Sequence, residues 1–329
     1  MKIFRINLYL NFFYYLSSIF KNHSNYEKKI IYEIKKNSNK NFFVFSSQLR
    51  VGFLILLKYL KKNNPEKNEI IFSSYNLEEM IEIAKNLKFK IKLVDIDIKT
   101  GCLNRQRFIN TMNKKTLALV YTNMFNDFKS QSIIKDFCKK KKITFIEDNA
   151  IYFDNFYLKK NKRIYSGSLG DYSLYSFNIM KNISGFFGGG VSTNDNEFIK
   201  YAYDEISNYK KFNKYMLLKQ IITFLLLKIL KFKVFYKIFI KILYQAHKKN
   251  NTSVLKIVYP SLKFKKVGFP NNYFTKISDL AKKVIYLQLK DFKNRIQNSS
   301  LRKKNNIYYY KKFKNLKIKN LKLLTIENF

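Results

Sequence analysis

Between Asn41 and Asp195, apolar residues alternate between short continuous runs and stretches at helical spacing. The continuous runs predict buried strands over 41–46, 69–74, 91–97, 116–122 and 143–148. The helical spacing predicts helices over 51–62, 77–87 and 133–141. Buried strands that alternate with helices indicate an open, mostly parallel α/β sheet packed between helices. Ligands bind at the carboxyl ends of such strands, so we expect a site among residues 46–50, 73–76, 123–126 and 148–150.

The pattern changes after Asp195. Residues 215–247 are strongly apolar but interrupted by lysines, and their longest uncharged run, 220–227, is far shorter than the roughly 20 residues of a spanning helix. In a helix, Lys233, Lys237 and Lys241 would share one stripe. Such a segment is typical either of a basic amphipathic helix on a membrane surface or of a helical hairpin buried against protein, and the sequence leaves both open.

The two ends of the chain carry further helical or apolar stretches. A lysine-rich, amphipathic helical segment is expected from about Tyr273 to Lys314. The first 20 residues are aromatic and apolar, but they contain Arg5 and have no small-residue cleavage site. We therefore expect them to pack on the body of the protein or to lie on a membrane surface, and not to act as a signal peptide.

The net charge of +42 suggests nucleic-acid binding, but the composition argues against it. Of the 64 cationic residues, 57 are Lys and only seven are Arg, the residue that reads phosphates and base edges best. Lysine is spread along the whole chain, and Asn, Ile, Phe and Tyr are also frequent while Gly and Pro are rare, which indicates an AT-rich coding bias. No nucleic-acid-binding module is recognisable, so we expect no nucleic-acid partner.

Cysteine and histidine content limits the chemistry further. Two cysteines, Cys102 and Cys138, cannot build a disulfide framework, which indicates a reducing compartment such as the cytoplasm. The two histidines, His23 and His247, are far apart in the sequence, so neither a histidine metal site nor a Ser-His-Asp triad is expected.

Four segments that carry chemistry follow one another in order: SSQLRVG at 46–52, IEDNA at 146–150, SLGDYSLYSFNIMKNIS at 168–184, and GGGVSTND at 188–195. Lys181 lies in an apolar, glycine-flanked context, where desolvation would lower its pKa and make it an imine-forming nucleophile. A buried Asp148 could keep a pyridinium nitrogen protonated, as pyridoxal phosphate requires. Taken singly, these residues could equally be a surface lysine and a helix-capping aspartate.

The ordered set resembles a known signature, S-L-G-D-x-x-x-[FY]-S-F-x-x-x-K-x-[LI]-[ST] followed by G-G-x-[VL]-x-T-N-D. It is that of the DegT/StrS-type sugar-nucleotide aminotransferases, which are pyridoxal-phosphate enzymes of the aspartate-aminotransferase fold (fold type I). IEDNA is similar to the family's [VI]-[IV]-E-D-x-A, and NMFND at 123–127 stands where the family has H-L-[YF]-G. The resemblance covers residues 42–195 in register and 270–329 more loosely.

The resemblance implies a role for each matching residue. Lys181 would hold the cofactor covalently and act as the base for the proton shift, and Asp148 would pair with the pyridine nitrogen. Ser176, with backbone N–H groups around Arg50 and Val51, would hold the cofactor phosphate. The family transfers an amino group, generally from glutamate, to a keto sugar nucleotide for surface-polysaccharide or lipopolysaccharide synthesis, and works as a homodimer.

Several residues depart from the family pattern. Asn76, in the turn beside the cofactor, stands where the family usually has Thr, and Leu77 follows it where an aromatic residue often stacks on the ring. Ile151 replaces a usual Gln or His near the ring. In the segment that reaches the partner subunit's cofactor, Phe274 replaces Asn and Lys276 replaces Arg.

The expected organisation has four parts: an N-terminal segment (1–40), a large cofactor-binding α/β domain (41–205), an apolar basic helical insertion (206–260) and a partial, truncated C-terminal small domain (261–329). The insertion is similar to one in a membrane-associated branch of the family. We therefore expect a cytoplasmic aminotransferase in which residues 215–247 either contact the inner membrane face or pack against protein. The alternative is an inactive relative that serves as an assembly partner on the membrane surface.

Overall fold

The structure is a computed structural model that describes residues 8–10, 12–20, 25–124, 128–151, 153, 156–159, 162–251, 269 and 274–316. Its centre is a seven-stranded sheet in the order β1-β9-β8-β5-β4-β2-β3. Its strands are β1 (Phe42–Ser46), β2 (Glu69–Ser73), β3 (Lys90–Val94), β4 (Thr116–Thr122), β5 (Thr144–Asp148), β8 (Tyr172–Ser176) and β9 (Gly189–Thr193).

The sheet is mostly parallel, as the sequence predicts. Strands β3, β2, β4, β5 and β8 pair in parallel, and β9 runs antiparallel to both of its neighbours, β8 and β1. The near-continuous apolar runs form strands that are covered on both faces; in β4, for example, every residue except the last is buried. The predicted α/β fold is therefore confirmed.

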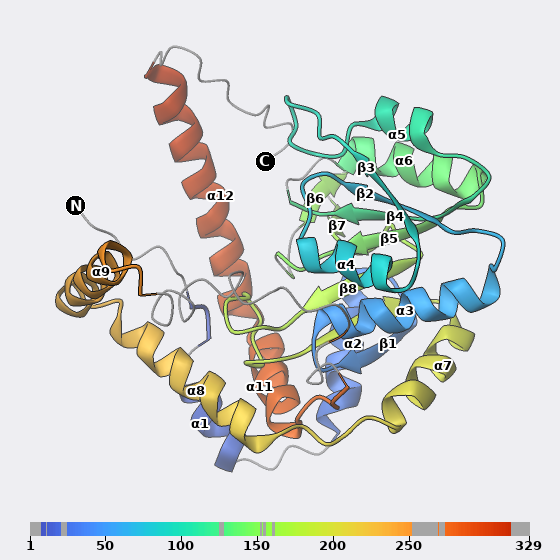
Figure 1. The fold of residues 1–329 in the computed structure, drawn as a ribbon. Helices are drawn as coiled ribbons and strands as arrows, with labels where there is room; N and C mark the ends of the chain where they lie inside the picture. The colour runs from blue at the N-terminus through green and yellow to red at the C-terminus, as the bar shows by residue number, and fades with distance from the viewer. Residues whose placement is uncertain are drawn as a thin grey trace.

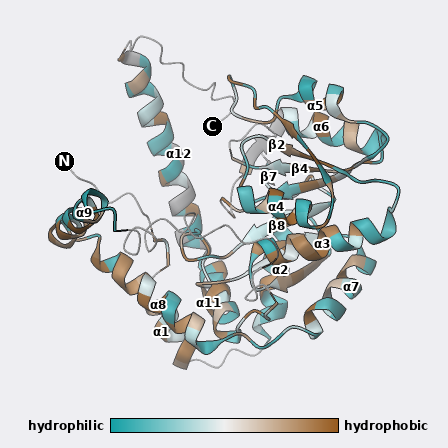
Figure 2. Ribbon diagram, viewed as in Figure 1, coloured by the Kyte–Doolittle hydropathy of each residue, from teal (hydrophilic) through white to brown (hydrophobic). Residues whose placement is uncertain are grey.

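Helices cover both faces of the sheet (Figure 1). One face packs against α3 (Leu49–Asn63), α4 (Glu78–Asn86) and α7 (Asn196–Ser207) in the largest apolar cluster. The other face packs against α5 (Arg105–Thr111) and α6 (Phe128–Lys140). Figure 2 shows hydrophobic residues along the strands between these layers. A two-stranded antiparallel ribbon, β6 (Phe156–Lys159) with β7 (Lys162–Tyr165), stands apart from the main sheet.

The N- and C-terminal helices pack together at one side of the sheet. They are α1 (Phe12–Phe20), α2 (Tyr26–Ser38), α11 (Asp279–Lys290) and α12 (Phe292–Asn315). Helix α11 contacts both α1 and α2, and its Ala281 and Ile285 share an apolar cluster with Phe177. Helix α12 extends away from the body (Figure 1). The helical segment expected at 273–314 is thus present, whereas the division at 261 stays a prediction and residues 317–329 lie outside the described part of the chain.

The apolar basic insertion consists of two helices, α8 (Lys214–Ile229) and α9 (Lys233–Lys248). Helix α8 packs one face on the body, where Ile221 and Phe224 are buried beside Leu10 and Phe186. The predicted lysine stripe lies on the single helix α9. No helix within the described residues is long and apolar enough to cross a bilayer.

Candidate active site

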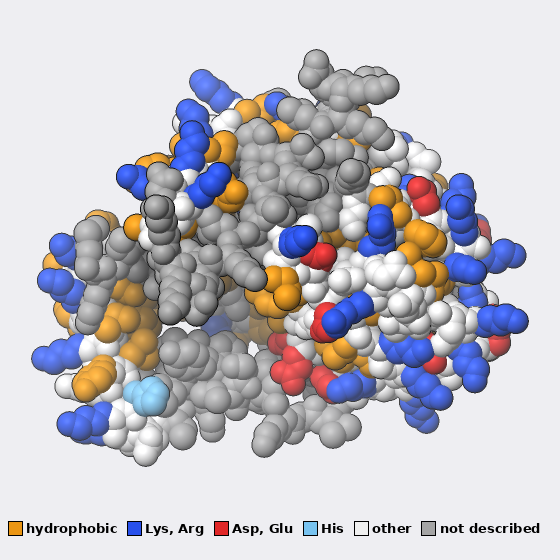
Figure 3. Space-filling model, turned by 90° about the horizontal axis from the view of Figure 1, so that it is seen from above, with side chains coloured by type: hydrophobic (Ala, Val, Ile, Leu, Met, Phe, Trp, Pro, Cys, Tyr) orange, Lys and Arg blue, Asp and Glu red, His pale blue; other side chains and the backbone are white. Residues whose placement is uncertain are grey.

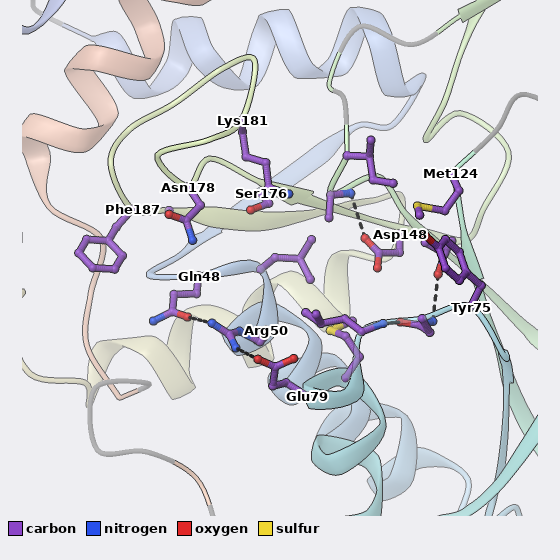
Figure 4. Close-up of a pocket in the computed structure, with 18 residues that line it drawn as sticks. Gln48, Arg50, Tyr75, Glu79, Met124, Asp148, Ser176, Asn178, Lys181 and Phe187 are labelled. Carbon is purple, nitrogen blue, oxygen red and sulfur yellow. Dashed lines mark hydrogen bonds and ion pairs between the residues drawn. The ribbon is translucent and has the colours of Figure 1, made fainter. Parts of the chain in front are cut away.

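A cavity of about 580 Å³ opens at the carboxyl ends of β2, β4, β5 and β8, beside the N-terminus of α3 (Figure 4). This is the edge of a parallel sheet where ligands are expected, and the volume lies within the roughly 300–1,000 Å³ of small-molecule sites. Five of the residues singled out from the sequence line it: Arg50, Asn76, Asp148, Ser176 and Lys181. The fold therefore brings together residues that are up to 131 positions apart in the sequence.

Asp148 and Lys181 influence each other's protonation across this cavity. Asp148 ends β5, is 4% exposed, and accepts a hydrogen bond from the Ala150 N–H at 2.9 Å. Burial raises the pKa of the Asp148 carboxyl, and the Ala150 hydrogen bond and the charge of Lys181 oppose that rise. Burial lowers the pKa of the Lys181 amine, and the Asp148 charge opposes that change. The cavity thus holds an amine and a carboxyl group that are both partly stripped of water.

The opposite wall is suited to an anion. Ser176 ends β8, and the Lys181 side chain extends toward it (Figure 4). Helix α3 begins beside it, and the side chain of its N-cap residue, Gln48, does not cap the backbone N–H groups of the first turn. The N-terminus of a helix carries a partial positive charge. The Arg50 guanidinium adds a full charge and is held by Glu79 Oε1 at 3.1 Å and Gln48 Oε1 at 3.0 Å.

The glycine run positions this turn. Gly189 lies in β9 opposite Ser46, and a Cβ atom there would come within 2.2 Å of the Leu49 nitrogen and 2.6 Å of the Gln48 carbonyl carbon. These are backbone atoms, so they cannot move aside as a side chain can. The absence of a side chain at Gly189 therefore allows the start of α3 to approach β9 closely.

Two predicted residues play a less direct part. Asn76 lies on the cavity wall, but its amide already bonds within the wall, donating to Thr122 Oγ1 at 2.9 Å and accepting from the Leu77 N–H at 2.7 Å. Val51 is fully buried in the core and does not line the cavity, and its N–H donates to the Gln48 carbonyl at 3.1 Å. Of the two residues, Leu49 lines the cavity and Val51 does not, so the N–H groups that are placed to bind an anion lie nearer to Leu49.

The cavity also has walls that the motif does not name. Tyr75 and Met124 lie at strand ends where the sequence predicts a site, so strand-end reasoning finds them. Phe187 lies in the loop before the glycine run and packs against Phe212, with ring centroids 5.2 Å apart. Local pattern carries no signal for Phe187, because its position depends on the path of the whole 177–188 loop.

The residues that depart from the family pattern divide into two groups. Leu77 and Ile151 line the cavity, as their places in the pattern imply. Phe274 and Lys276 do not line it. They lie at the root of the insertion, where the Lys210 N–H donates to the Phe274 carbonyl at 3.1 Å and the Lys276 N–H donates to the Lys210 carbonyl at 2.8 Å. Of the NMFND segment, residues 125–127 lie outside the described residues.

Glu147, next to Asp148, has a different task. It is fully buried and its carboxylate accepts hydrogen bonds from two side chains and three backbone N–H groups, those of Gln131, Asn123, Gly167, Leu169 and Gly170. Neighbouring residues of a strand point to opposite faces of the sheet. Asp148 lines the cavity, so Glu147 points to the other face of the sheet, where it holds the loop that leads into β8.

Three solved structures with a similar fold are described as follows. CalS13, a sugar aminotransferase from Micromonospora echinospora, superposes with a TM-score of 0.64 over 99% of this chain and 77% of its own, at 12% identity. An E. coli GDP-4-keto-6-deoxy-D-mannose-3-dehydratase with bound hydrated PLP gives 0.63 over 98% and 77%, at 16% identity. Helicobacter pylori PseC, an aminotransferase involved in the biosynthesis of pseudoaminic acid, gives 0.52 over 61% and 54%, at 16% identity.

At these identities the likeness shows a shared fold, and the chain spans about half the length of PseC. No curated protein matches it by sequence. The model of the DegT/DnrJ/EryC1/StrS aminotransferase family matches residues 39–216, more than half of the chain and the part that builds the sheet and the cavity. On this match, the chain belongs to the DegT/DnrJ/EryC1/StrS aminotransferase family.

Proposed function

We propose that this protein is a pyridoxal-phosphate-dependent aminotransferase that transfers an amino group from glutamate to a keto sugar nucleotide. The observation that supports it is the donor set on one cavity: the Lys181 amine, the buried Asp148 carboxyl, the Ser176 hydroxyl and the N-terminus of α3. The amine suits an aldehyde, the carboxyl group suits a ring nitrogen, and the hydroxyl group and the helix N-terminus suit a phosphate. The residues present therefore fit the cofactor that the family uses.

In this proposal Asp148 would hold a proton on the ring nitrogen, because a desolvated carboxyl group bonds strongly to a partner that carries positive charge. Lys181 would bind the cofactor aldehyde and would act as the base that moves a proton between the α-carbon of the substrate and the former aldehyde carbon of the cofactor. Its lowered pKa serves both tasks, since it raises the fraction of neutral amine near neutral pH. Pyridoxal phosphate, when bound, supplies the electron sink.

The anion-binding wall would orient the cofactor. Ser176 and the N–H groups at the start of α3 would hold its phosphate, and Arg50 lies close enough in the wall to add charge. Tyr75, at the opposite wall, offers the aromatic face that Leu77 does not. We assign the remaining volume to the sugar, whose carbon position the cavity walls do not specify.

The wider setting that we propose is surface-polysaccharide or lipopolysaccharide precursor synthesis in the cytoplasm, by a homodimer. Peripheral contact with the inner membrane face would go with it. The two buried cysteines, neither in a disulfide, are consistent with a reducing compartment.

A second candidate is a relative that has lost transamination and acts as an assembly partner. The observation that favours it is the apolar character of two cavity residues, Leu77 and Ile151, at positions where the family has ring-contacting groups. Both candidates retain the same cavity, so only a chemical readout separates them.

The test is spectroscopic. Pyridoxal phosphate added to the purified protein should produce a visible absorbance band that shifts on addition of glutamate. The band should be lost in Lys181→Ala and kept in Lys228→Ala, which removes another lysine whose pKa burial lowers but which lies on α8, outside the cavity lining. A band that persists in Lys181→Ala, or no band at saturating cofactor, would refute the enzyme. A band that does not shift with any amino donor would favour the second candidate.

A further inference from the structure

Among the residues that the structure describes, none covers a second apolar face of helix α8. The face that includes Ile221 and Phe224 is buried against the body. On the opposite side, six apolar residues at helical spacing are 38–72% exposed, namely Tyr215, Leu218, Ile222, Leu225, Leu226 and Ile229. Burial of one face therefore leaves a second apolar stripe along the whole length of the helix.

Helix α9 continues this surface with a different pattern. Val234, Phe235, Ile238 and Ile242 are 50–66% exposed and fall on one stripe of the helix. The exposed lysines Lys233, Lys237 and Lys241 form the adjoining stripe. On the side of the molecule where α9 lies in Figure 1, Figure 3 shows hydrophobic side chains with Lys and Arg along their outer rim.

The charge of residues 210–251 indicates which kind of partner can cover the exposed faces of α8 and α9. Residues 210–251 contain eleven lysines and no Asp or Glu, although the whole chain has one acidic residue for about every three basic ones. A second copy of the chain would bring the same charge against it, and like charges across an interface oppose association. An anionic lipid surface offers both negative charge and an apolar interior to such a helix pair.

We propose that the exposed faces of α8 and α9 lie in the surface of a membrane that contains anionic lipids. The apolar stripes enter the boundary between headgroups and acyl chains, and the lysine stripe of α9 contacts the headgroups. Neither helix spans the bilayer. No residue of α8 or α9 lines the cavity, so this inference stands whether or not the protein is an active transaminase.

The experiment is flotation of the full chain with phosphatidylcholine vesicles, with and without phosphatidylglycerol. The protein should float only with the anionic vesicles, and less so at high salt, which screens surface charges. The variant K233Q/K237Q/K241Q should bind roughly 100-fold more weakly, because each lysine near an anionic surface contributes roughly fivefold. Replacing the apolar pair, Ile238→Ser with Ile242→Ser, should also weaken binding by about tenfold or more.

A matched control removes the same charge elsewhere. The variant K139Q/K140Q/K141Q changes three exposed lysines at the end of α6 and should bind as the wild type does. If this control lost as much vesicle binding as the α9 lysine variant, binding would depend on net charge alone, and the proposal would be overturned. It is also overturned if the wild type binds neither kind of vesicle, or if the α9 variants change only the oligomeric state. Circular dichroism of each variant keeps a folding defect from being taken for a binding defect.

Discussion

Glu147 offers the sharpest test of how the site is built. Its carboxylate receives five hydrogen bonds, three at Oε1 and two at Oε2. Glu147→Gln keeps the shape but replaces one oxygen with an NH₂ group, which cannot accept. The glutamine amide can place its NH₂ group at either oxygen position. The Oε2 position leaves fewer donors unpaired, namely the backbone N–H groups of Leu169 and Gly170.

The cost follows from the donors that are left unpaired. A buried donor without a partner costs about 1–3 kcal/mol, so two donors cost about 2–6 kcal/mol. Against a typical unfolding free energy of about 5–15 kcal/mol, this loss is large. Urea unfolding of Glu147→Gln should therefore show a clearly lower midpoint than the wild type.

Asp148→Asn, one residue along the strand, is the matched comparison. Asp148 accepts one hydrogen bond, from Ala150, which Asn can also accept, and its burial already disfavours the charged form. Its free energy of unfolding should change by less than about 1 kcal/mol. A loss of unfolding free energy below about 1 kcal/mol in Glu147→Gln, or an equal loss in both variants, would contradict the structural role of Glu147.

Three further outcomes are expected. Asp148→Asn should keep cofactor binding but lose most of the glutamate-induced spectral shift, measured on the folded variant. Gly189→Ala should weaken pyridoxal-phosphate binding about 30-fold, as expected if the displaced start of α3 loses one charge-assisted hydrogen bond of about 2 kcal/mol. Gly170→Ala, where a Cβ atom would also crowd backbone atoms, at 2.8 Å, but outside the cavity lining, should not; equal affinities of the two variants would contradict the anion-binding role of this wall. Because burial lowers the pKa of Lys181, this group binds fewer protons in the native state than in the unfolded state between that pKa and 10.5. Its contribution to stability therefore rises with pH across this window, and Lys181→Met should show a smaller rise than the wild type in a pH series of thermal melts.

The sheet was largely predictable because its strands are short, near-continuous apolar runs. This is the pattern of strands that are covered on both faces. Each predicted strand and helix between 41 and 148 is present within a few residues of its expected ends. The antiparallel direction of β9 was not predictable from local pattern. It depends on pairing with β1, which is far away in the sequence, and with β8 across the loop at 177–188.

The site was predictable to the extent that ordered motifs end on strands. Lys181, Asp148 and Ser176 meet because their segments end at the same edge of the sheet. Which of the two acidic residues in β5 faces the cavity could not be deduced from alternation alone. The insertion shows the same limit, because periodicity reveals an apolar face but not whether the body of the protein covers it; for α8 it covers one face and leaves the other exposed.

The composition of the chain bears on where its glycines lie. A coding bias toward A and T depletes glycine, whose codons begin with two G bases, and only nine glycines remain among 329 residues. Seven of them stand where a Cβ atom would come within 3.0 Å of another atom. Under such mutational pressure, the glycines that survive mark the places where selection holds the backbone in close contact.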